Sequence, residues 1–285
     1  MTTFAITAAN GQLGRLVLEQ LKKRVPADNI VALVRDPVKA TDLGVAVRAG
    51  DYDKPDELEA SLQGVDKLLL ISGMMPGAAG ANQHQNVINA AKKAGVTYIA
   101  YTSVVNADNS PFADLGPKHR GTEDALKASG LDYTILRHAW YSENYTESVP
   151  AALANNALYG SAKDGKISSA TRADLAEADA IVLSSDEHHG KTYELAGDET
   201  YTLSDFAAVL SELAGKDITY VDMPQADYAA ALQQAGLPDE LAEALAYWDS
   251  CVAQDAVFST DKTLAKLLGC PTTDLKTAIQ AALQS

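Results

Sequence analysis

Residues 5–21, AITAANGQLGRLVLEQL, have the composition of a turn that binds phosphate between a strand and a helix. Gly11 would let the backbone approach a pyrophosphate closely, and Gly14 would let the helix pack against a sheet. The first amides of a helix have no partner inside it, so they can donate to a phosphate. Ala8 and Ala9 occupy the place of the usual first glycine, where an alanine is tolerable at negative φ but costs about 1–2 kcal/mol at positive φ. A plain strand-to-helix turn is the alternative interpretation.

Arg35 indicates which nucleotide the turn would take. It lies 21 residues after Gly14, at the end of a second apolar run. A site for NAD has an acidic residue about 20 residues beyond the glycines, on the ribose hydroxyl. An arginine there suits the 2′-phosphate of NADP, because its planar fork forms paired, charge-assisted hydrogen bonds with phosphate. Asp36 is the competing acidic residue, but it is also placed to cap a helix that begins at Pro37. The pattern therefore favours NADP over NAD.

Strand-like and helix-like segments alternate through the first half of the chain. Apolar runs of strand length lie at residues 4–7, 29–34, 45–49, 67–71, 98–102 and 133–136. Helical patterns separate most of them, at residues 13–25, 55–62, 82–94 and 122–128. This alternation predicts an α/β fold over residues 1–140, namely a Rossmann-type doubly wound parallel sheet with helices on both faces.

The rhythm changes in residues 141–285, which we predict to form a smaller, mainly helical substrate lobe. Alanine-rich helical patterns cover residues 150–158, 174–183, 203–213, 226–235, 241–246, 264–268 and 275–283. Short strands are expected at residues 192–195 and 218–222, and they would partly extend the first sheet.

The composition limits the classes of function. The chain has 285 residues and a formal net charge of −15 without a basic patch, which argues against nucleic-acid binding. No apolar run reaches the ~18 residues of a membrane span, and Met1 leads directly into a strand without a basic signal region. Cys251 and Cys270 are expected to be reduced thiols of a cytoplasmic protein. The five histidines form no HExxH motif, so no metal site is predicted.

Several longer strings resemble one known family. ITAANGQLG, VALVRDP, GDYDKPDELEASLQGVDKLLLIS, HQNVINAAKKAGVTYIAYTS, AWYSENY and SATRADLAEA are together similar to the NmrA-like, atypical short-chain dehydrogenase group, and within it to the bacterial NAD(P)H:quinone oxidoreductase 2 type. The likeness covers nearly the whole chain. The family turn is TGATGQLG, so Ala8 replaces its first glycine and Asn10 its threonine. His138-Ala139 stands where the family usually has Asn-Gly.

The resemblance implies a set of cofactor contacts. It places Asp51 near the adenine, Ser72 and Gly73 beside the ribose and phosphates, and residues 138–144 around the nicotinamide. Arg172 would reach toward the site, with a local ion pair to Asp174 as the alternative. The full expected set for NADP is Ala8, Ala9, Asn10, Gly11, Gln12, Leu13, Arg35, Asp51, Ser72, Gly73, Met74, His138, Ala139, Trp140, Tyr141, Ser142, Glu143, Asn144 and Arg172.

The sequence lacks the usual acid of a short-chain dehydrogenase, a helical tyrosine followed four residues later by lysine. Among the twelve tyrosines only Tyr159 has that lysine, and Gly160 interrupts any helix there, so we interpret the match as chance. Ser103 stands where the helper serine would be, which means little without the tyrosine. Lys118 and His119 are the nearest candidate acids, although the favoured interpretation is that both are surface residues at the start of a helix.

The missing acid favours a particular acceptor. Reduction of a ketone creates an alkoxide that needs a proton at once, whereas a quinone becomes a stabilised phenolate that can take its proton from water. An enzyme for quinones then needs orientation more than acid catalysis. Loops at the carboxyl ends of strands would supply an apolar slot for the quinone, lined by Met75, Trp140, Tyr141 and Tyr145. Packing in the core is the alternative interpretation of the aromatic side chains.

The expected function is thus NADPH-dependent hydride transfer to small quinones without flavin, by a protein that could form a homodimer. The alternative is a catalytically silent NADP-binding redox sensor of the NmrA type, which acts through a protein partner. An epimerase is disfavoured, because it would also need the tyrosine and lysine.

Overall fold

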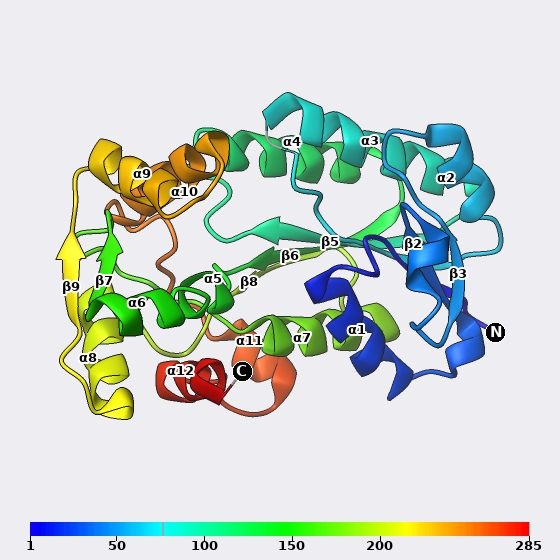
Figure 1. Ribbon diagram of the computed structural model, residues 1–285. Coiled ribbons are helices and arrows are strands. Elements are labelled where there is room, and N and C mark those ends of the chain that lie inside the picture. The colour runs from blue at the N-terminus through cyan, green and yellow to red at the C-terminus, as the bar shows by residue number, and fades with distance from the viewer. Residues whose placement is uncertain (76, 285) are drawn as a thin grey trace.

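A seven-stranded parallel sheet runs through the computed structural model, which describes residues 1–75 and 77–284 (Figure 1). Its strands lie in the order β3-β2-β1-β4-β5-β6-β8, and every adjacent pair is parallel. The strands are β1 (Phe4–Ile6), β2 (Ile30–Val34), β3 (Ala46–Ala49), β4 (Lys67–Leu70), β5 (Tyr98–Val104), β6 (Asp132–His138) and β8 (Lys191–Leu195). The predicted Rossmann-type α/β fold is therefore confirmed.

Helices cover both faces of this sheet (Figure 1). One face carries α1 (Gln12–Lys22), α7 (Arg172–Ser184) and α11 (Thr263–Leu268), and the other carries α2 (Pro55–Ser61), α3 (Gly77–Ala94) and α4 (Leu115–Ala128). Successive residues of β2 alternate between the two apolar cores, which is why the strand reads as an unbroken apolar run, IVALV. Two short 3₁₀ helices, η1 (Ala27–Asn29) and η2 (Pro37–Ala40), flank β2.

A third apolar core lies beside the main sheet, on the left of Figure 1. It is built around a two-stranded parallel sheet of β7 (Ala157–Gly160) and β9 (Thr219–Asp222). The helices of this half are α5 (Glu143–Thr146), α6 (Val149–Asn155), α8 (Leu203–Ala214), α9 (Gln225–Gln234), α10 (Asp239–Val252) and α12 (Leu275–Gln284). Strand β8 joins the main sheet, as expected for residues 192–195, whereas β9 pairs with β7 in the separate sheet and does not extend the first one. The boundary at residue 140 stays a prediction.

One element differs in type from the sequence prediction. The helix expected over residues 150–158 ends at Asn155, and residues 157–160 form strand β7. Asn156 adopts a left-handed conformation at φ 51°, and its backbone N–H donates to the carbonyl of Ala152, which closes the helix. Alanine-rich sequence hides this stop, since alanine favours helix wherever packing does not oppose it.

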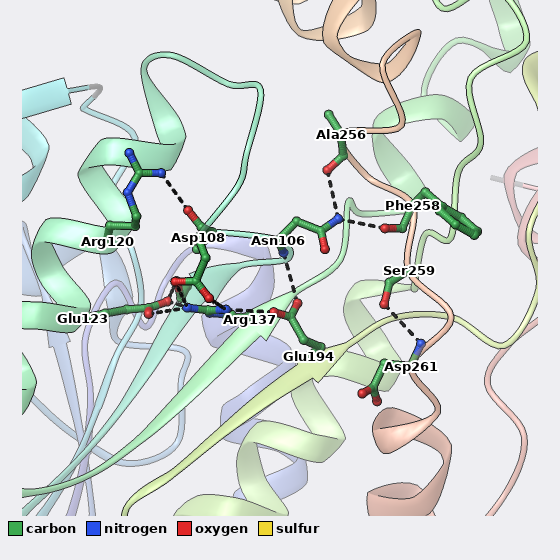
Figure 2. A network of polar contacts seen from close by, with 12 residues as sticks. Asn106, Asp108, Arg120, Glu123, Arg137, Glu194, Ala256, Phe258, Ser259 and Asp261 are labelled. Atoms are coloured by element: carbon green, nitrogen blue, oxygen red, sulfur yellow. Dashed lines mark hydrogen bonds and ion pairs between the residues drawn. The ribbon is translucent and has the colours of Figure 1, made fainter.

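A network of charges around the buried pair of Arg137 and Glu123 joins the sheet to the second half of the chain (Figure 2). Arg137 on β6 donates to Glu123 at 2.7 and 2.9 Å, to Asp108 at 2.8 and 2.9 Å and to Glu194 at 3.0 Å. Glu194 also accepts from the backbone N–H of Asn106, whose side chain donates to the carbonyl of Phe258 at 2.7 Å. The network fixes the loop after β5 against both halves of the molecule.

The arrangement of the strands brings the predicted site together. The strand order turns at β1, which pairs with β2 on one side and β4 on the other. Ligands of such sheets bind beyond the carboxyl ends of the strands, at this switch point. The segments after β1, β2, β3, β4 and β6 carry the predicted cofactor residues, so they share one edge of the sheet. Among the described helices, none is long and apolar enough to cross a membrane.

Candidate functional site

The turn after β1 is closed by its own backbone. The N–H of Gly11 donates to the carbonyl of Ala8 at 2.9 Å, and Ala8 has a positive φ of 48°. A Cβ on Gly14 would lie 2.4 Å from the Ala8 oxygen and 2.7 Å from the Ala9 Cα, so only glycine fits there. Helix α1 therefore packs tightly on the turn, as expected for Gly14. Ala8 therefore has the positive φ, which costs an alanine about 1–2 kcal/mol, and not the negative φ at which an alanine is tolerable.

The start of α1 is suited to phosphate. Gly11 is the N-cap, in extended conformation at φ −75°, and it has no side-chain cap; the first turn carries no acidic residue. The first amides of the helix thus have no side-chain competitor, and the positive end of the helix dipole is uncompensated. This uncapped, non-acidic helix start fits the pyrophosphate of a dinucleotide.

Arg35 projects from the end of β2 as an exposed side chain. Within residues 1–75 and 77–284 it has neither a hydrogen-bond nor an ion-pair partner. Asp36 caps η2 by accepting from the N–H of Val38 at 3.2 Å and also pairs with Lys39 at 3.3 Å. The capping interpretation of Asp36 is confirmed, and Arg35 is left free to meet an anionic ligand.

Hydrogen bonds join the residues that follow strands β1, β3 and β4, next to the turn. The hydroxyl of Tyr52, just after β3, donates to the carbonyl of Ile71, and it lies 2.5 Å from Thr7 Oγ1. Thr7 Oγ1 accepts from the N–H of Ile71 at 2.9 Å. Burial raises the pKa of Tyr52, so it stays a neutral donor. The predicted contacts Asp51 and Ser72 are the sequence neighbours of Tyr52 and Ile71 in this cluster and are partly exposed.

Lys118 and His119 are buried, so the surface interpretation is wrong. Their side chains are 3% and 6% exposed, and the Lys118 ammonium donates to the carbonyl of Gly73 at 2.6 Å. Burial lowers the pKa of Lys118 to about 8. His119 Nδ1 lies 2.7 Å from the hydroxyl of Tyr101, and burial lowers the pKa of His119 well below its ordinary value. Position in the helix misled the prediction, since the first turns of α4 face the interior of the protein.

His84 completes the contacts of Gly73. Burial lowers the pKa of His84 to about 3, so the ring is neutral at physiological pH. Its Nε2 accepts from the N–H of Gly73 at 3.1 Å, which leaves the proton on Nδ1, 2.9 Å from Thr122 Oγ1. Thr122 in turn donates to the carbonyl of Lys118 at 3.0 Å. Both polar backbone groups of Gly73 are therefore held by side chains from α3 and α4.

The contribution of His84, Tyr101 and Thr122 to this site was not predicted from the sequence. The network joins α3, α4, β5 and the segment after β4, and no spacing within the chain signals it. Ser103 donates to Glu123 at 2.6 Å, so it belongs to the charge network rather than to a catalytic set. Tyr159 lies in strand β7 and is 43% exposed, so it is not part of a helical tyrosine-lysine pair.

Residues 138–144 follow the end of β6. His138 is buried, and its Nε2 lies 2.8 Å from the carboxylate of Asp179 on α7. The ring of Tyr141 meets the His138 ring edge to face, with centroids 6.3 Å apart. Ala139 and Ser142 are also buried, whereas Asn144 is exposed. The imidazole of His138 thus points into the core below the sheet, and its contact with a nicotinamide stays a prediction.

Arg172 at the start of α7 holds the segment after β6. Its backbone N–H donates to the two carboxylate oxygens of Glu143 at 2.9 and 3.1 Å. Its guanidinium lies 4.7 Å from the centroid of the Tyr141 ring and donates to the side-chain oxygen of Asn144 at 3.1 Å. The alternative ion pair with Asp174 is wrong, since Asp174 accepts from Thr273 instead. A cleft of about 580 Å³ opens beside these residues, and Gln12 of α1 also lines it.

The predicted acceptor residues fall into two environments. Trp140 is half-buried and stacks on Phe112 with centroids 5.5 Å apart, and Trp248 meets it edge to face at 5.9 Å. Tyr145 is buried, and its hydroxyl lacks a hydrogen-bond partner in the described part of the chain. Met74 and Met75 are 89% and 48% exposed, where apolar side chains are available to a ligand.

These features define the class of protein. An uncapped helix start after β1, a free arginine after β2 and a shared edge of strand ends form a nucleotide site of the Rossmann type. A family profile described as NAD(P)H-binding matches residues 8–186.

The comparisons with known proteins extend over nearly the whole chain. Quinone oxidoreductase 2 of Escherichia coli is 52% identical over 278 residues, which are 96% of each chain. The crystal structure of that organism's NADPH-dependent quinone oxidoreductase QOR2 complexed with NADPH has a TM-score of 0.94 at 51% identity and covers 99% of this chain and 100% of its own. Triphenylmethane reductase of Citrobacter sp. has a TM-score of 0.95 at 37% identity, with 99% and 100% coverage. The chain belongs to the NmrA-like family of NAD(P)H-binding reductases that includes quinone oxidoreductase 2.

Proposed function

We propose that this protein reduces small quinones by two electrons with NADPH, without a flavin. The observation that carries the proposal is its similarity to quinone oxidoreductase 2 over nearly the full length of both chains. The site supports it with a turn that fits a pyrophosphate and a free arginine that fits a 2′-phosphate.

NADPH, when bound, supplies the hydride. The chain's own residues bind and orient the two reactants: the amides at the start of α1 hold the pyrophosphate, and Arg35 meets the 2′-phosphate. Gly73, held by Lys118 and His84, fixes the segment after β4 beside the ribose and phosphates of the cofactor. Orientation of this kind can supply a large part of a rate enhancement.

The acceptor lies in the apolar surroundings of Trp140. The stacked Phe112 supports one face of the indole, and Trp248 closes its edge. A flat quinone matches such aromatic walls, because offset and edge-to-face ring contacts are favourable. Tyr141, Tyr145 and Met75 line the remaining sides in this proposal.

The proton comes from water. A quinone that gains a hydride becomes an aromatic phenolate, which is stable enough to wait for a solvent proton. Lys118 is a cation at neutral pH, because its pKa of about 8 lies above that pH. Its ammonium is bonded to Gly73, so we assign it a positioning function rather than general acid catalysis.

The test is a steady-state assay of the purified protein with NADPH, a panel of quinones and an aliphatic ketone. We expect quinone turnover with a primary isotope effect from deuterated NADPH, no stimulation by added flavin and poor ketone reduction. Tyr159→Phe should leave the rate nearly unchanged. NADPH binding without turnover of any quinone would instead support the redox-sensor alternative, and collapse of the rate in Tyr159→Phe would restore the ordinary dehydrogenase mechanism.

A homodimer and a cytoplasmic location also belong to this proposal. Both cysteines, buried Cys251 and exposed Cys270, are free thiols, in keeping with a reducing compartment. Sedimentation equilibrium and cell fractionation test the two statements separately.

A further inference from the structure

Arg15 bridges two segments of the nucleotide site. Its Nε donates to the carbonyl of Asn10 in the turn at 3.2 Å, and its two terminal nitrogens donate to the carboxylate of Asp42 at 2.7 and 3.3 Å. Asp42 follows η2, the short helix directly after Arg35. The guanidinium therefore lies between the turn that fits a pyrophosphate and the segment after β2, where the adenosine half of a dinucleotide is expected.

Cations are concentrated at this place on an otherwise acidic chain. The whole chain has a net charge of −15. Here the start of α1 and the segment after β2 carry three cations, Arg15, Arg35 and Lys39, and two carboxylates, Asp36 and Asp42. Lys39 pairs with Asp36 at 3.3 Å and Arg15 with Asp42, so one positive charge is in excess. An added anion of the ligand would be attracted to this spot and repelled by most of the remaining surface.

The pair of Arg15 and Asp42 can be opened at low cost. Their side chains are 40% and 61% exposed, and ion pairs in contact with solvent contribute little to stability. A phosphate monoester carries about −1.5 to −2 charges and three strong acceptor oxygens, which makes it a stronger partner for a guanidinium fork than one carboxylate. The arginine can thus exchange partners while its Nε contact holds it at the turn.

We propose that Arg15 is a second ligand for the 2′-phosphate of NADPH, beside Arg35, and that Asp42 holds its guanidinium until the phosphate replaces it. This inference rests on the proposed NADPH site. When the ligand is NADH, which lacks the phosphate, the guanidinium stays on Asp42. The exchange of partners thereby adds to the discrimination between the two coenzymes.

The experiment measures binding of two probes by calorimetry, adenosine 2′,5′-bisphosphate and 5′-AMP, which differ only in the 2′-phosphate. Arg15→Met should weaken the bisphosphate about tenfold, the effect of one lost charge-assisted contact partly screened by solvent, and leave 5′-AMP unchanged. Arg24→Met is the matched control, because Arg24 also lies in an exposed ion pair, with Glu177, just beyond the far end of α1. It should change neither probe.

Asp42→Asn tests the exchange itself. It should tighten the bisphosphate severalfold in the parent, because Arg15 is released in advance. In the Arg15→Met background the same change should have less than half of that effect at physiological salt, where a direct repulsion is screened. An equal effect in both backgrounds would show that Asp42 merely repels the phosphate and would overturn the exchange.

Other outcomes separate this inference from the proposed function. If Arg35→Met weakens the bisphosphate selectively but Arg15→Met does not, the inference is wrong and the NADPH site stands. Equal weakening of both probes by Arg15→Met would also overturn it, since Arg15 would then only shape the turn. If the parent does not distinguish the two probes, both the inference and the preference for NADPH fail.

Discussion

The ammonium of Lys118 lies 2.6 Å from the carbonyl oxygen of Gly73, across 45 positions of sequence. This hydrogen bond joins α4 to the segment after β4, at the edge of the sheet where the nucleotide site lies. A Cβ on Gly80 of α3 would lie 2.9 Å from Cε of Lys118 and 2.0 Å from the carbonyl oxygen of Met75, so α3 is packed closely against the same segment. The charge of Lys118 is thus buried where backbone position matters for binding.

Lys118 should make stability depend on pH in the alkaline range. Burial lowers its pKa from 10.5 to about 8, so between these values the unfolded chain binds more protons than the folded protein. Stability should therefore rise with pH across this window, while below it the full cost of burying the cation is present. Between about pH 7.5 and about pH 9.5 the parent should gain about 2 kcal/mol relative to Lys118→Met in urea unfolding.

The same variant tests catalysis. Lys118→Met should lower kcat by less than the 10²–10⁴-fold expected on loss of a general acid, because water supplies the proton. His119→Ala should behave likewise. A loss in that range by either variant, with NADPH binding intact, would contradict the positioning function and make that residue the acid.

Ala8 should be a site where glycine is better than alanine. Its φ of 48° costs about 1–2 kcal/mol for an L side chain, while glycine gives back about 0.4–1 kcal/mol through the more flexible unfolded chain. Ala8→Gly should therefore stabilise the protein by about 0.5–1 kcal/mol and bind NADPH at least as well as the parent.

Ala9→Gly is the control for that change. Ala9 is fully buried and is absent from the described residues with positive φ, so its replacement should destabilise by about 1 kcal/mol. Thermal unfolding measures both variants. Failure of Ala8→Gly to stabilise the protein would mean that the turn relaxes around Ala8 and that the strain is absent.

Arg35 should determine most of the coenzyme preference. Arg35→Asp replaces a free cation by an anion at the predicted 2′-phosphate, which should remove roughly 1–3 kcal/mol of the preference for NADPH over NADH. Arg24→Asp changes the net charge equally, just past the far end of α1, and should leave the ratio unchanged. The measurement is the ratio of kcat/KM with NADPH to kcat/KM with NADH. Equal ratios in the parent and Arg35→Asp would reject the assignment of Arg35 to the 2′-phosphate.

Gly11→Val should abolish NADPH binding, since its side chain would occupy the place of the pyrophosphate. Even a Cβ at Gly11 would lie 3.2 Å from the Ala8 oxygen, so the fold of the variant must be checked by circular dichroism. Calorimetric titration with NADPH gives the answer. Binding like that of the parent by a folded Gly11→Val would place the nucleotide elsewhere.

The elements that could be predicted from the sequence are those with a local signal. The unbroken apolar run of β2 and the spacing of Gly11 and Gly14 each follow from short-range geometry. Burial of Lys118 could not be predicted, because its partner Gly73 lies far away in the sequence and its cost appears only in the packed fold. The positive φ of Ala8 is equally non-local, since the carbonyl of Leu33 on β2 accepts the N–H of Ala9 and fixes the turn.

Arg137 should be essential for stability rather than for catalysis. Its side chain and that of Glu123 are 8% and 1% exposed, so Arg137→Met leaves the buried Glu123 carboxylate with only Lys127, at 3.7 Å, as a cationic partner (Figure 2). Breaking a buried pair in this way typically costs about 3–5 kcal/mol. The double variant Arg137→Met/Glu123→Leu removes both charges and should recover at least half of that loss. Urea unfolding of the parent, the two single variants and the double variant forms a complete cycle, in which the coupling between the two sites is read directly. Additive losses would mean that the two charges are stabilised independently, by Asp108 and Glu194 on one side and by Lys127 on the other, and that the pair does not hold the loop after β5 in place.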